Sequence, residues 1–284
     1  MQQINNVVVI GAGQMGAGIA QVAAVAGFKI KLYDVESGYV DRGLNNINKN
    51  LQRLAEKGKL TPAACEQTAA RLTGVNKLAA AADADLIIEA APESPTIKKN
   101  IFLDLDKICP AKTIFATNTS SIPITELAAV TKRADRFIGM HFAFPVPVMK
   151  MLELICGLET SADTFQAVKE AGEKMGKEAY RVNDFPGFCG NRIVIPMINE
   201  AIFALMESVA TAEDIDGLLK AGYNHPMGPL ALADLIGLDT VLAIMEVLYN
   251  GYKDPKYRPC PLLKKMVQAG YLGRKAGRGF YSYQ

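Results

Sequence analysis

The chain has 284 residues, half of them hydrophobic, and its 31 basic and 29 acidic side chains leave a formal net charge of +2. A chain of this length and composition buries a full hydrophobic core and commonly forms two domains. The near-neutral balance provides no global attraction to nucleic acid or to a membrane surface, so we expect neither as a partner.

The expected compartment and redox state follow from features that the sequence lacks. The first apolar run begins within a few residues of Met1, which leaves no room for a signal peptide, and no uncharged apolar run reaches the roughly 18 residues of a membrane span. The five cysteines contain no C-x-x-C pair, and the two histidines are not clustered with other metal ligands. We therefore expect a cytoplasmic protein with reduced thiols and no bound metal.

The most informative motif joins an apolar run to a glycine-rich turn. Residues 7–16 read Val-Val-Val-Ile-Gly-Ala-Gly-Gln-Met-Gly, a G-x-G-x-x-G pattern directly after a predicted strand. In such a turn Gly11 permits the tight exit from the strand, Gly13 lets the backbone approach a pyrophosphate, and Gly16 lets the next helix pack closely on the sheet. The phosphates of the ligand then lie at a helix N-terminus.

The segments after the turn have the order of a dinucleotide-binding unit. A helix is predicted from Met15 to Ala26 and a second strand from Phe28 to Tyr33, which puts Asp34 at the carboxyl end of that strand. A carboxylate there accepts hydrogen bonds from a ribose diol and repels a 2′-phosphate, so the pattern favours NAD over NADP. The alternative is an ordinary βαβ unit that binds nothing. The predicted cofactor contacts of this unit are Gly11, Gly13, Gln14, Met15, Gly16 and Asp34.

The next predicted helix, near residues 44–57, is cationic along one face. Lys49, Arg53 and Lys57 recur at positions i, i+4 and i+8, so their side chains form a cationic ridge. Such a ridge suits a phosphate-rich ligand, although a solvated helix face without a ligand explains the same pattern.

Apolar and helical segments then alternate along the chain. This alternation indicates a parallel, doubly wound sheet, that is, an α/β domain of the Rossmann type. The predicted strands are Leu86–Ala90, Thr113–Thr117, Phe137–Met140, Met151–Ile155 and Ala179–Val182. The predicted helices are Lys98–Ile108, a short helix near Thr125, and Ala162–Met175.

The pattern changes at residues 183–187, Asn-Asp-Phe-Pro-Gly, after which helices predominate. The expected helices are Asn191–Glu207, Ala212–Lys220, Leu230–Leu248 and Pro261–Gln268. We therefore predict a Rossmann-like, NAD-binding domain over residues 1–184 and an all-helical domain over residues 185–284.

Several further motifs occur in a fixed order. They are Asn-Thr-Ser-Ser at 118–121, Gly-Met-His-Phe at 139–142, the proline-rich run 145–150 leading to Glu153, Asp-Phe-Pro-Gly-Phe at 184–188 before Asn191, His-Pro-Met-Gly-Pro at 225–229, Gly-Leu-Asp at 237–239 and Gly-Arg-Gly-Phe-Tyr at 277–281. With the dinucleotide turn, they closely resemble the 3-hydroxyacyl-CoA dehydrogenase family over nearly the whole chain. The resemblance, strongest to short bacterial members, implies an NAD-dependent oxidoreductase that interconverts (S)-3-hydroxybutyryl-CoA and acetoacetyl-CoA in butyrate or fatty acid metabolism.

The chemistry of such a reaction directs attention to the two histidines. Oxidation of a secondary alcohol needs a group that removes the hydroxyl proton, and a residue that titrates near neutrality suits both directions. His141 follows the predicted strand 137–140, at the carboxyl edge of the sheet where open α/β folds bind ligands. His225 precedes Pro226 in a predicted loop, and we expect it to be a structural residue.

Three further residues complete the catalytic set that the resemblance implies. Glu153 would bind the far nitrogen of the His141 imidazole, although alternation along its strand also allows a surface position. Ser120 and Asn191 would hydrogen-bond the substrate oxygen, although each could instead cap a helix.

The resemblance also implies ligand contacts outside the catalytic set. Asn50 and Lys57 would contact the CoA part of an acyl-CoA thioester, and Glu93, Lys98 and Lys275 would contact NAD. It further implies a homodimer formed through the C-terminal domain, which would therefore serve substrate binding and dimerisation.

One position departs from the family pattern. The family usually reads H-F-F-N-P from the catalytic histidine onward, whereas residues 141–145 here read His-Phe-Ala-Phe-Pro. Phe144 cannot donate the amide hydrogen bonds of the usual Asn, which puts one substrate or cofactor contact in doubt. Two other functions therefore stay open, a dehydrogenase of a free hydroxy acid and a non-catalytic NAD-binding relative.

Overall fold

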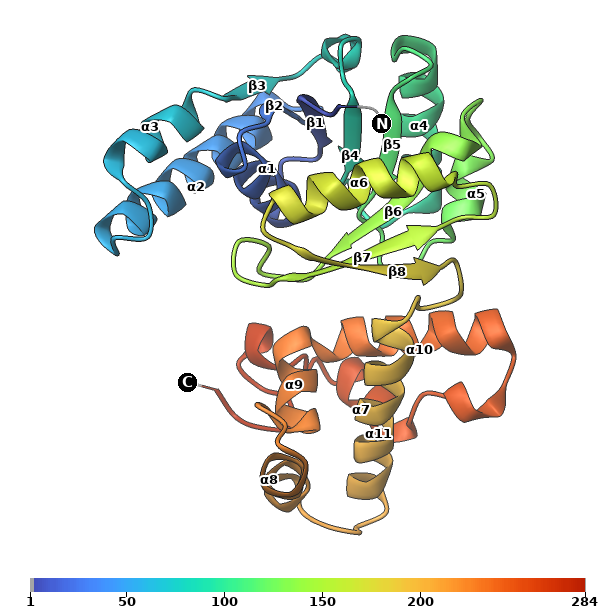
Figure 1. Cartoon of the computed structure of the whole chain (residues 1–284). Coiled ribbons are helices and arrows are strands. Elements are labelled where there is room, and N and C mark those ends of the chain that lie inside the picture. Colours follow the sequence, from blue (N-terminus) through green and yellow to red (C-terminus); the bar gives the residue numbers. More distant parts are fainter. Residues whose placement is uncertain (1–2, 284) are drawn as a thin grey trace. The chain divides into compact units, whose positions relative to one another are not determined.

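The computed structural model describes residues 3–283, which form two compact units. The first unit ends at Asp184 and the second begins at Phe185. Each unit has its own cluster of buried hydrophobic side chains. Figure 1 shows the α/β architecture of the first unit and the helices of the second.

The described part of the first unit is built on an eight-stranded sheet with the strand order β3-β2-β1-β4-β5-β6-β7-β8. The strands are β1 (Asn6–Ile10), β2 (Lys29–Tyr33), β3 (Leu72–Val75), β4 (Leu86–Glu89), β5 (Ile114–Thr117), β6 (Phe137–Phe142), β7 (Met151–Cys156) and β8 (Glu178–Asn183). Neighbouring strands are parallel except for β6 and β7. The predicted Rossmann-type α/β fold is confirmed.

The antiparallel pairing of β6 with β7 differs from the fully parallel sheet that the sequence pattern predicts. Only residues 143–150 connect the two strands. A parallel connection needs a crossover of a dozen or more residues, which this proline-rich link cannot supply. The same pairing extends β6 to Phe142, so His141 lies inside the strand and not after it.

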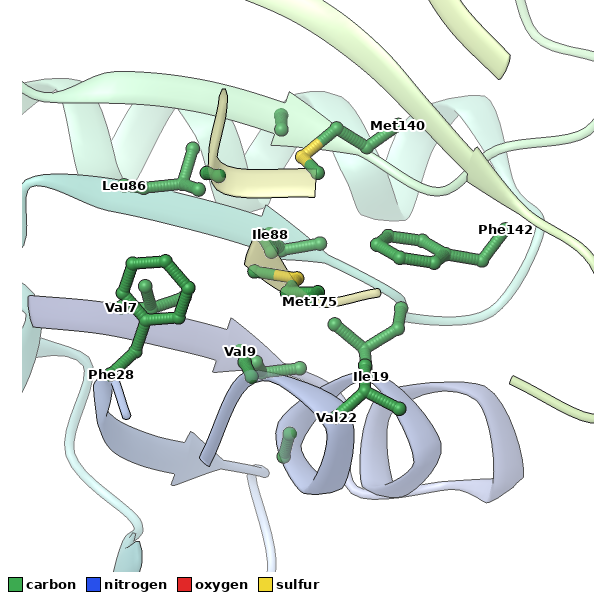
Figure 2. Close-up of a cluster of buried hydrophobic side chains, with 14 of the residues drawn as sticks. Val7, Val9, Ile19, Val22, Phe28, Leu86, Ile88, Met140, Phe142 and Met175 are labelled. Carbon is green, nitrogen blue, oxygen red and sulfur yellow. The ribbon is translucent and has the colours of Figure 1, made fainter. Parts of the chain in front are cut away.

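Helices cover both faces of the sheet. On the face shown in Figure 2, Val9 of β1 and Met140 of β6 belong to one buried cluster with Ile19 of α1. On the other face, the ring of Phe102 in α4 lies 4.6 Å from that of Phe137 in β6, measured between centroids. The helices of this unit are α1 (Gln14–Val25), α2 (Ser37–Glu56), α3 (Pro62–Ala69), α4 (Pro95–Ile108), α5 (Ile124–Ala128) and α6 (Ala162–Lys174).

The second unit packs its helices around its own core and fixes the C-terminal segment with a buried carboxylate. Its helices are α7 (Gly190–Met206), α8 (Ala212–Tyr223), α9 (Pro229–Ile236), α10 (Leu238–Tyr252) and α11 (Pro261–Gln268). Ile198, Leu230 and Met245 are fully buried in the core. The carboxylate of Asp234, buried in α9, accepts the backbone N–H groups of residues 280 and 281 at 3.0 Å each. These bonds compensate the cost of burying a charge.

Two local predictions differ from the structure. The single helix predicted over residues 230–248 is divided into α9 and α10, because Gly237 has a φ of +98° that no helix residue adopts. Residues 62–75, for which the sequence pattern predicts no element, form α3 and β3. The side chain of Thr61 starts α3 by accepting the N–H of Ala64.

The structure also bears on membrane, metal and thiol chemistry. Within residues 3–283, no helix is both long and apolar enough to cross a membrane, and no group of three or more His, Cys, Asp or Glu side chains could hold a metal ion. Cys109, Cys156 and Cys260 are buried free thiols. Burial raises the pKa of the Cys109 thiol to about 11, so this group stays protonated at neutral pH.

Replacement of Gly237 by Ala is expected to lower the free energy of unfolding by about 1–3 kcal/mol, the usual cost of a backbone conformation that side chains rarely adopt. The added Cβ would also lie 3.0 Å from Oδ1 of Asp239. Gly217→Ala in α8 is the matched control, because its Cβ would meet nothing within 4 Å. Alanine favours a helix interior by about 0.5–1 kcal/mol over glycine, so this variant should be more stable. Urea unfolding measures both, and equal losses would contradict the special conformation of Gly237.

Candidate active site

The glycine-rich turn after β1 has the shape that a dinucleotide requires. Gly11 has a φ of +102°, and a Cβ there would lie 2.6 Å from the carbonyl oxygen of Ala90, just beyond β4. A Cβ on Gly16 would lie 1.8 Å from the carbonyl oxygen of Gly11. The helix can therefore approach the turn this closely only because residue 16 is glycine. A Cβ on Gly13 would meet nothing within 4 Å. The backbone at Gly13 therefore faces open space, as a pyrophosphate contact needs.

The N-terminus of α1 and the carboxylate of Asp34 complete this unit. Helix α1 begins at Gln14 without a capping side chain and without an acidic residue in its first turn, which suits an anion there. Met15, in the first turn of α1, is partly buried and packs against the core. Oδ2 of Asp34 accepts the N–H of Ala12 at 2.8 Å, and Oδ1 accepts that of Val35 at 2.8 Å. These residues fit NAD.

His141 and Glu153 form a close pair at the end of the sheet. The register of β6 against β7 places the two residues directly opposite each other, and Nδ1 of His141 lies 2.8 Å from Oε2 of Glu153. The Glu153 side chain is 5% exposed, which excludes the surface position that strand alternation allowed. A carboxylate on Nδ1 favours the neutral tautomer with the proton on Nδ1, so that Nε2 offers a lone pair.

Ser120 lies in the loop after β5, which is connected to β6 close to His141. Oδ1 of Asn118 accepts the N–H of Phe142 at 3.0 Å. The N–H of Ser120 donates to Oε1 of Glu93 at 3.0 Å. Helix α5 begins at Ile124 with Pro123 at its N-cap, so Ser120 does not cap this helix. The candidate serine is therefore held by a carboxylate from the loop before α4.

Lys98 and Glu93 lie together with Glu89, a residue that sequence reasoning missed. Nζ of Lys98 lies 2.7 Å from Oε1 of Glu89 and 3.4 Å from Oε2 of Glu93. Burial raises the pKa of Glu89, against the opposing effect of Lys98. Burial also opposes ionisation of Glu93, but Lys98 and hydrogen bonds from Thr119 and Ser121 outweigh it and lower the pKa of Glu93. The one signal in the sequence that could have identified Glu89 is an acidic residue at the end of an otherwise apolar strand.

The cationic ridge lines two adjoining cavities in the first unit. A cavity of about 430 Å³ is lined by Lys49 and Arg53 of α2 and by Phe144, which is 61% exposed. A neighbouring cavity of about 490 Å³ is lined by Arg53 and Lys57. Asn50 borders both cavities. Its amide donates to the side-chain oxygen of Gln21 at 3.2 Å. Asn50 and Lys57, the residues that the sequence connected with CoA, both line the second cavity.

The remaining candidates belong to the second unit. Asn191 is the second residue of α7, whose N-cap is Cys189, so Asn191 is not the capping residue. Nζ of Lys275 lies 2.7 Å from Oδ2 of Asp239 at the start of α10. His225 lies in the loop after α8, where its backbone N–H donates to the carbonyl oxygen of residue 219, in agreement with the predicted loop.

The sequence matches the NAD-binding domain of 3-hydroxyacyl-CoA dehydrogenases over residues 6–185. It matches the C-terminal domain of 3-hydroxyacyl-CoA dehydrogenases over residues 187–283. Both matches agree with the resemblance drawn from the motifs and with NAD as the cofactor.

Individual relatives are similar over their full length. A protein of Bacillus subtilis named probable 3-hydroxybutyryl-CoA dehydrogenase is 56% identical over 282 residues, which cover 99% of this chain and 98% of that protein. The 3-hydroxybutyryl-CoA dehydrogenase of Bradyrhizobium diazoefficiens is 52% identical over 281 residues, which cover 99% of this chain and 96% of that protein. The crystal structure of (S)-3-hydroxybutyryl-CoA dehydrogenase from Ralstonia eutropha has a TM-score of 0.97 at 51% identity and covers 99% of this chain and 100% of that one.

Asp34→Asn is expected to reduce the preference for NADH over NADPH. The amide accepts hydrogen bonds from the ribose hydroxyls more weakly than the carboxylate does, and it does not repel a 2′-phosphate. The ratio of the two dissociation constants should fall about tenfold, which corresponds to about 1.4 kcal/mol. Titration of each dinucleotide by fluorescence measures the ratio. Asp104→Asn, which removes an exposed carboxylate on α4, is the control and should change neither constant. Equal weakening of both dinucleotides in Asp34→Asn would contradict a ribose contact.

Proposed function

Because the chain belongs to the 3-hydroxyacyl-CoA dehydrogenase family, it is an NAD-dependent dehydrogenase, and we propose that it interconverts (S)-3-hydroxybutyryl-CoA and acetoacetyl-CoA. The observation that carries this proposal is the His141–Glu153 pair at the end of β6. Strand β1, which leads into the dinucleotide turn, and β6 run parallel in one sheet, so their carboxyl ends share an edge. A proton acceptor and a hydride acceptor at one edge are what alcohol oxidation needs.

The proposed mechanism divides the work between cofactor and side chains. The glycine turn after β1 and Asp34 would hold NAD, which would supply a hydride acceptor for the alcohol carbon and, in its reduced form, a hydride donor for the reverse direction. Nε2 of His141 takes the hydroxyl proton, and the Glu153 carboxylate stabilises the resulting imidazolium. Ser120 and Asn191 hydrogen-bond the substrate oxygen, so its developing charge is shared among several donors. No covalent intermediate is required.

The CoA part of the substrate is proposed to bind along α2. The exposed side chains of Lys49, Arg53 and Lys57 would pair with its phosphates, and Asn50 would hydrogen-bond it. Phe144 lines the first of the two cavities beside α2 and provides an apolar face where the family usually has an amide. Glu93 and Lys275 are kept as proposed NAD contacts.

The assembly and the cellular setting are also proposals. The second unit exposes large apolar side chains, among them Ile193 (65%), Leu218 (64%) and Leu235 (50%). Exposed apolar surface of this kind supports a homodimer formed through this unit. The family resemblance supports a cytoplasmic enzyme of butyrate or fatty acid metabolism.

Two alternative functions are less well supported. A dehydrogenase of a free hydroxy acid would have no use for the cationic ridge and the two cavities beside it, which extend well beyond a small acid. A non-catalytic NAD-binding relative would not need a buried Glu153 carboxylate paired with the partly exposed imidazole of His141. Phe144 is the position that keeps the second alternative open to test.

The enzyme is expected to oxidise NADH, followed by its absorbance, when acetoacetyl-CoA is supplied. Free acetoacetate in place of acetoacetyl-CoA, or NADPH in place of NADH, should give at most a few per cent of that rate. Equal turnover of the free acid would favour the hydroxy-acid alternative. NADH binding without turnover would favour the non-catalytic relative, and Phe144→Asn would then be the first variant to assay for recovered activity.

Lys57→Gln is expected to raise KM for acetoacetyl-CoA by about threefold to tenfold and to weaken its salt dependence, since one phosphate contact is worth about 1 kcal/mol. It should leave kcat unchanged because the side chain lies outside the catalytic set. The N-acetylcysteamine thioester of acetoacetate lacks the nucleotide, so its KM should not change. Lys169→Gln on α6 is the charge-matched control. A rise in KM for the truncated thioester as well would contradict a CoA phosphate contact.

A further inference from the structure

One buried ammonium group in the first unit takes no part in the proposed reaction. Lys177, the residue before β8, is only 7% exposed. Within residues 3–283 its side chain is hydrogen-bonded to two backbone carbonyl oxygens and paired with no acidic group. Burial of a charge is costly and is tolerated only where hydrogen bonds compensate it. The segment that accepts these bonds therefore indicates what Lys177 does.

Both bonds are made to the link of residues 143–150 between β6 and β7. Nζ of Lys177 donates to the carbonyl oxygen of Val146 and, at 2.8 Å, to that of Met149. Inside the link, the N–H groups of Val148 and Met149 donate to the carbonyl oxygen of Pro145 at 2.9 and 3.0 Å, so the chain forms a tight turn. Hydrogen bonds from a charged donor are about twice as strong as neutral ones, so the ammonium is a firm anchor for this turn.

The backbone of Lys177 is itself fixed by the end of α6. The N–H of Gly176 donates to the carbonyl oxygen of Glu173 at 2.9 Å, and that of Lys177 donates to the carbonyl oxygen of Gly172 at 3.0 Å. With a φ of +75° at Gly176, this is the Schellman ending of a helix. A Cβ on Gly172 would lie 2.5 Å from Leu152 of β7, so this end of α6 packs closely on the sheet. The Lys177 side chain therefore extends from a rigid base.

Helix α1 supports the link by packing. Val146 is 1% exposed and belongs to the core cluster of the first unit. A Cβ on Gly18 of α1 would lie 3.0 Å from Cβ of Val146 and 3.5 Å from Cδ of Pro147. The link is thus held by van der Waals contact with α1 and by hydrogen bonds from Lys177.

The link forms part of the wall of the two cavities beside α2. Pro145 and Pro147 line both cavities together with Arg53 of α2. Lys177 is not among the described residues that line either of them. Any effect of Lys177 on a ligand in these cavities would therefore be transmitted through the link.

We propose that Lys177 is a positioning residue of the CoA site: its ammonium group fixes the link 143–150 and thereby the wall that the link contributes to the two cavities beside α2. Lys177 acts through the link and makes no contact of its own with a CoA phosphate. The inference rests on the proposed function wherever CoA is the probe, whereas the state of the link can be measured without any ligand.

Lys177→Met is the decisive variant, because it keeps an unbranched side chain of similar length and removes both hydrogen bonds. Hydrogen–deuterium exchange of peptides covering residues 143–150 should become about tenfold faster. The dissociation constant of CoA alone, measured by calorimetry, and KM for acetoacetyl-CoA should both rise about fivefold to tenfold, because the wall of the site is no longer held in place.

The same variant should leave the chemical step intact. The register of β6 with β7 pairs residues on both sides of His141 and Glu153, so kcat should change less than about twofold. The dissociation constant of NADH should also change less than about twofold, and so should KM for the N-acetylcysteamine thioester of acetoacetate, which lacks the nucleotide. A general loss of structure would move all of these values together.

Lys174→Met is the matched control. Lys174 is exposed and lies in α6, three residues before Lys177, and both side chains line a third cavity of about 450 Å³. Its Nζ lies over the ring of Phe28, at 4.4 Å from the centroid, and not on the link. The control removes the same charge nearby, so it should leave exchange at 143–150 and CoA binding unchanged.

Three results would overturn the proposal. Weaker CoA binding in Lys177→Met with unchanged exchange at 143–150 would make Lys177 a direct phosphate contact. Faster exchange with unchanged CoA binding would make its bonds to the link purely structural. Equal effects of Lys174→Met would reduce its role to general positive charge.

The proposed function and this inference fail in different ways. Wild-type protein that binds no CoA would contradict the proposed CoA site, and exchange at 143–150 would still decide whether Lys177 fixes the link. If Lys177→Met does not fold, Lys177→Gln keeps a neutral donor and should show the same pattern at about threefold size. Unchanged exchange and CoA binding in that variant would equally overturn the proposal.

Discussion

The antiparallel pairing of β6 with β7 is the contact on which the candidate site depends. A link of residues 143–150 is too short for a crossover, so the chain must reverse, and the resulting register sets His141 opposite Glu153. A slip of one residue would move Glu153 to the other face of the sheet, into the apolar cluster that includes Met140. The same link contributes Phe144 to a cavity beside α2, so one short connection shapes both the His141–Glu153 pair and the cavity that we propose binds CoA.

Carboxylates at strand ends recur throughout the first unit, and each is held by a different means. Backbone N–H groups hold Asp34 after β2. A buried ammonium and a threonine hydroxyl hold Glu89 at the end of β4. An imidazole faces Glu153 across β6 and β7. Asp34 and Glu89 lie at the carboxyl ends of β2 and β4, which run in the same direction, whereas Glu153 lies near the start of β7, which runs antiparallel to β6. All three carboxylates therefore lie toward the edge of the sheet where open α/β folds bind ligands.

The sequence predicted those features whose cause is local. The glycine turn, Asp34 and the strand periodicity depend on neighbouring residues, and each is found where the pattern indicated. The break at Gly237 was missed because the apolar period continues through it, and only its φ value reveals the interruption. The contacts of Glu89 could not be predicted, because its partners on α4 and β5 are brought to it only by the folded sheet. The burial of Glu153 likewise depends on strand pairing.

The Glu153 carboxylate is expected to hold the imidazole of His141 with its proton on Nδ1, and ¹⁵N NMR of the histidine side chains tests this tautomer most directly. The chain has two histidines, so His225→Gln assigns both. At a pH where His141 is neutral, we predict a protonated Nδ1 and an unprotonated Nε2, and a changed tautomer population in Glu153→Leu. A proton on Nε2 in the wild type, or a population that Glu153→Leu leaves unchanged, would contradict the account.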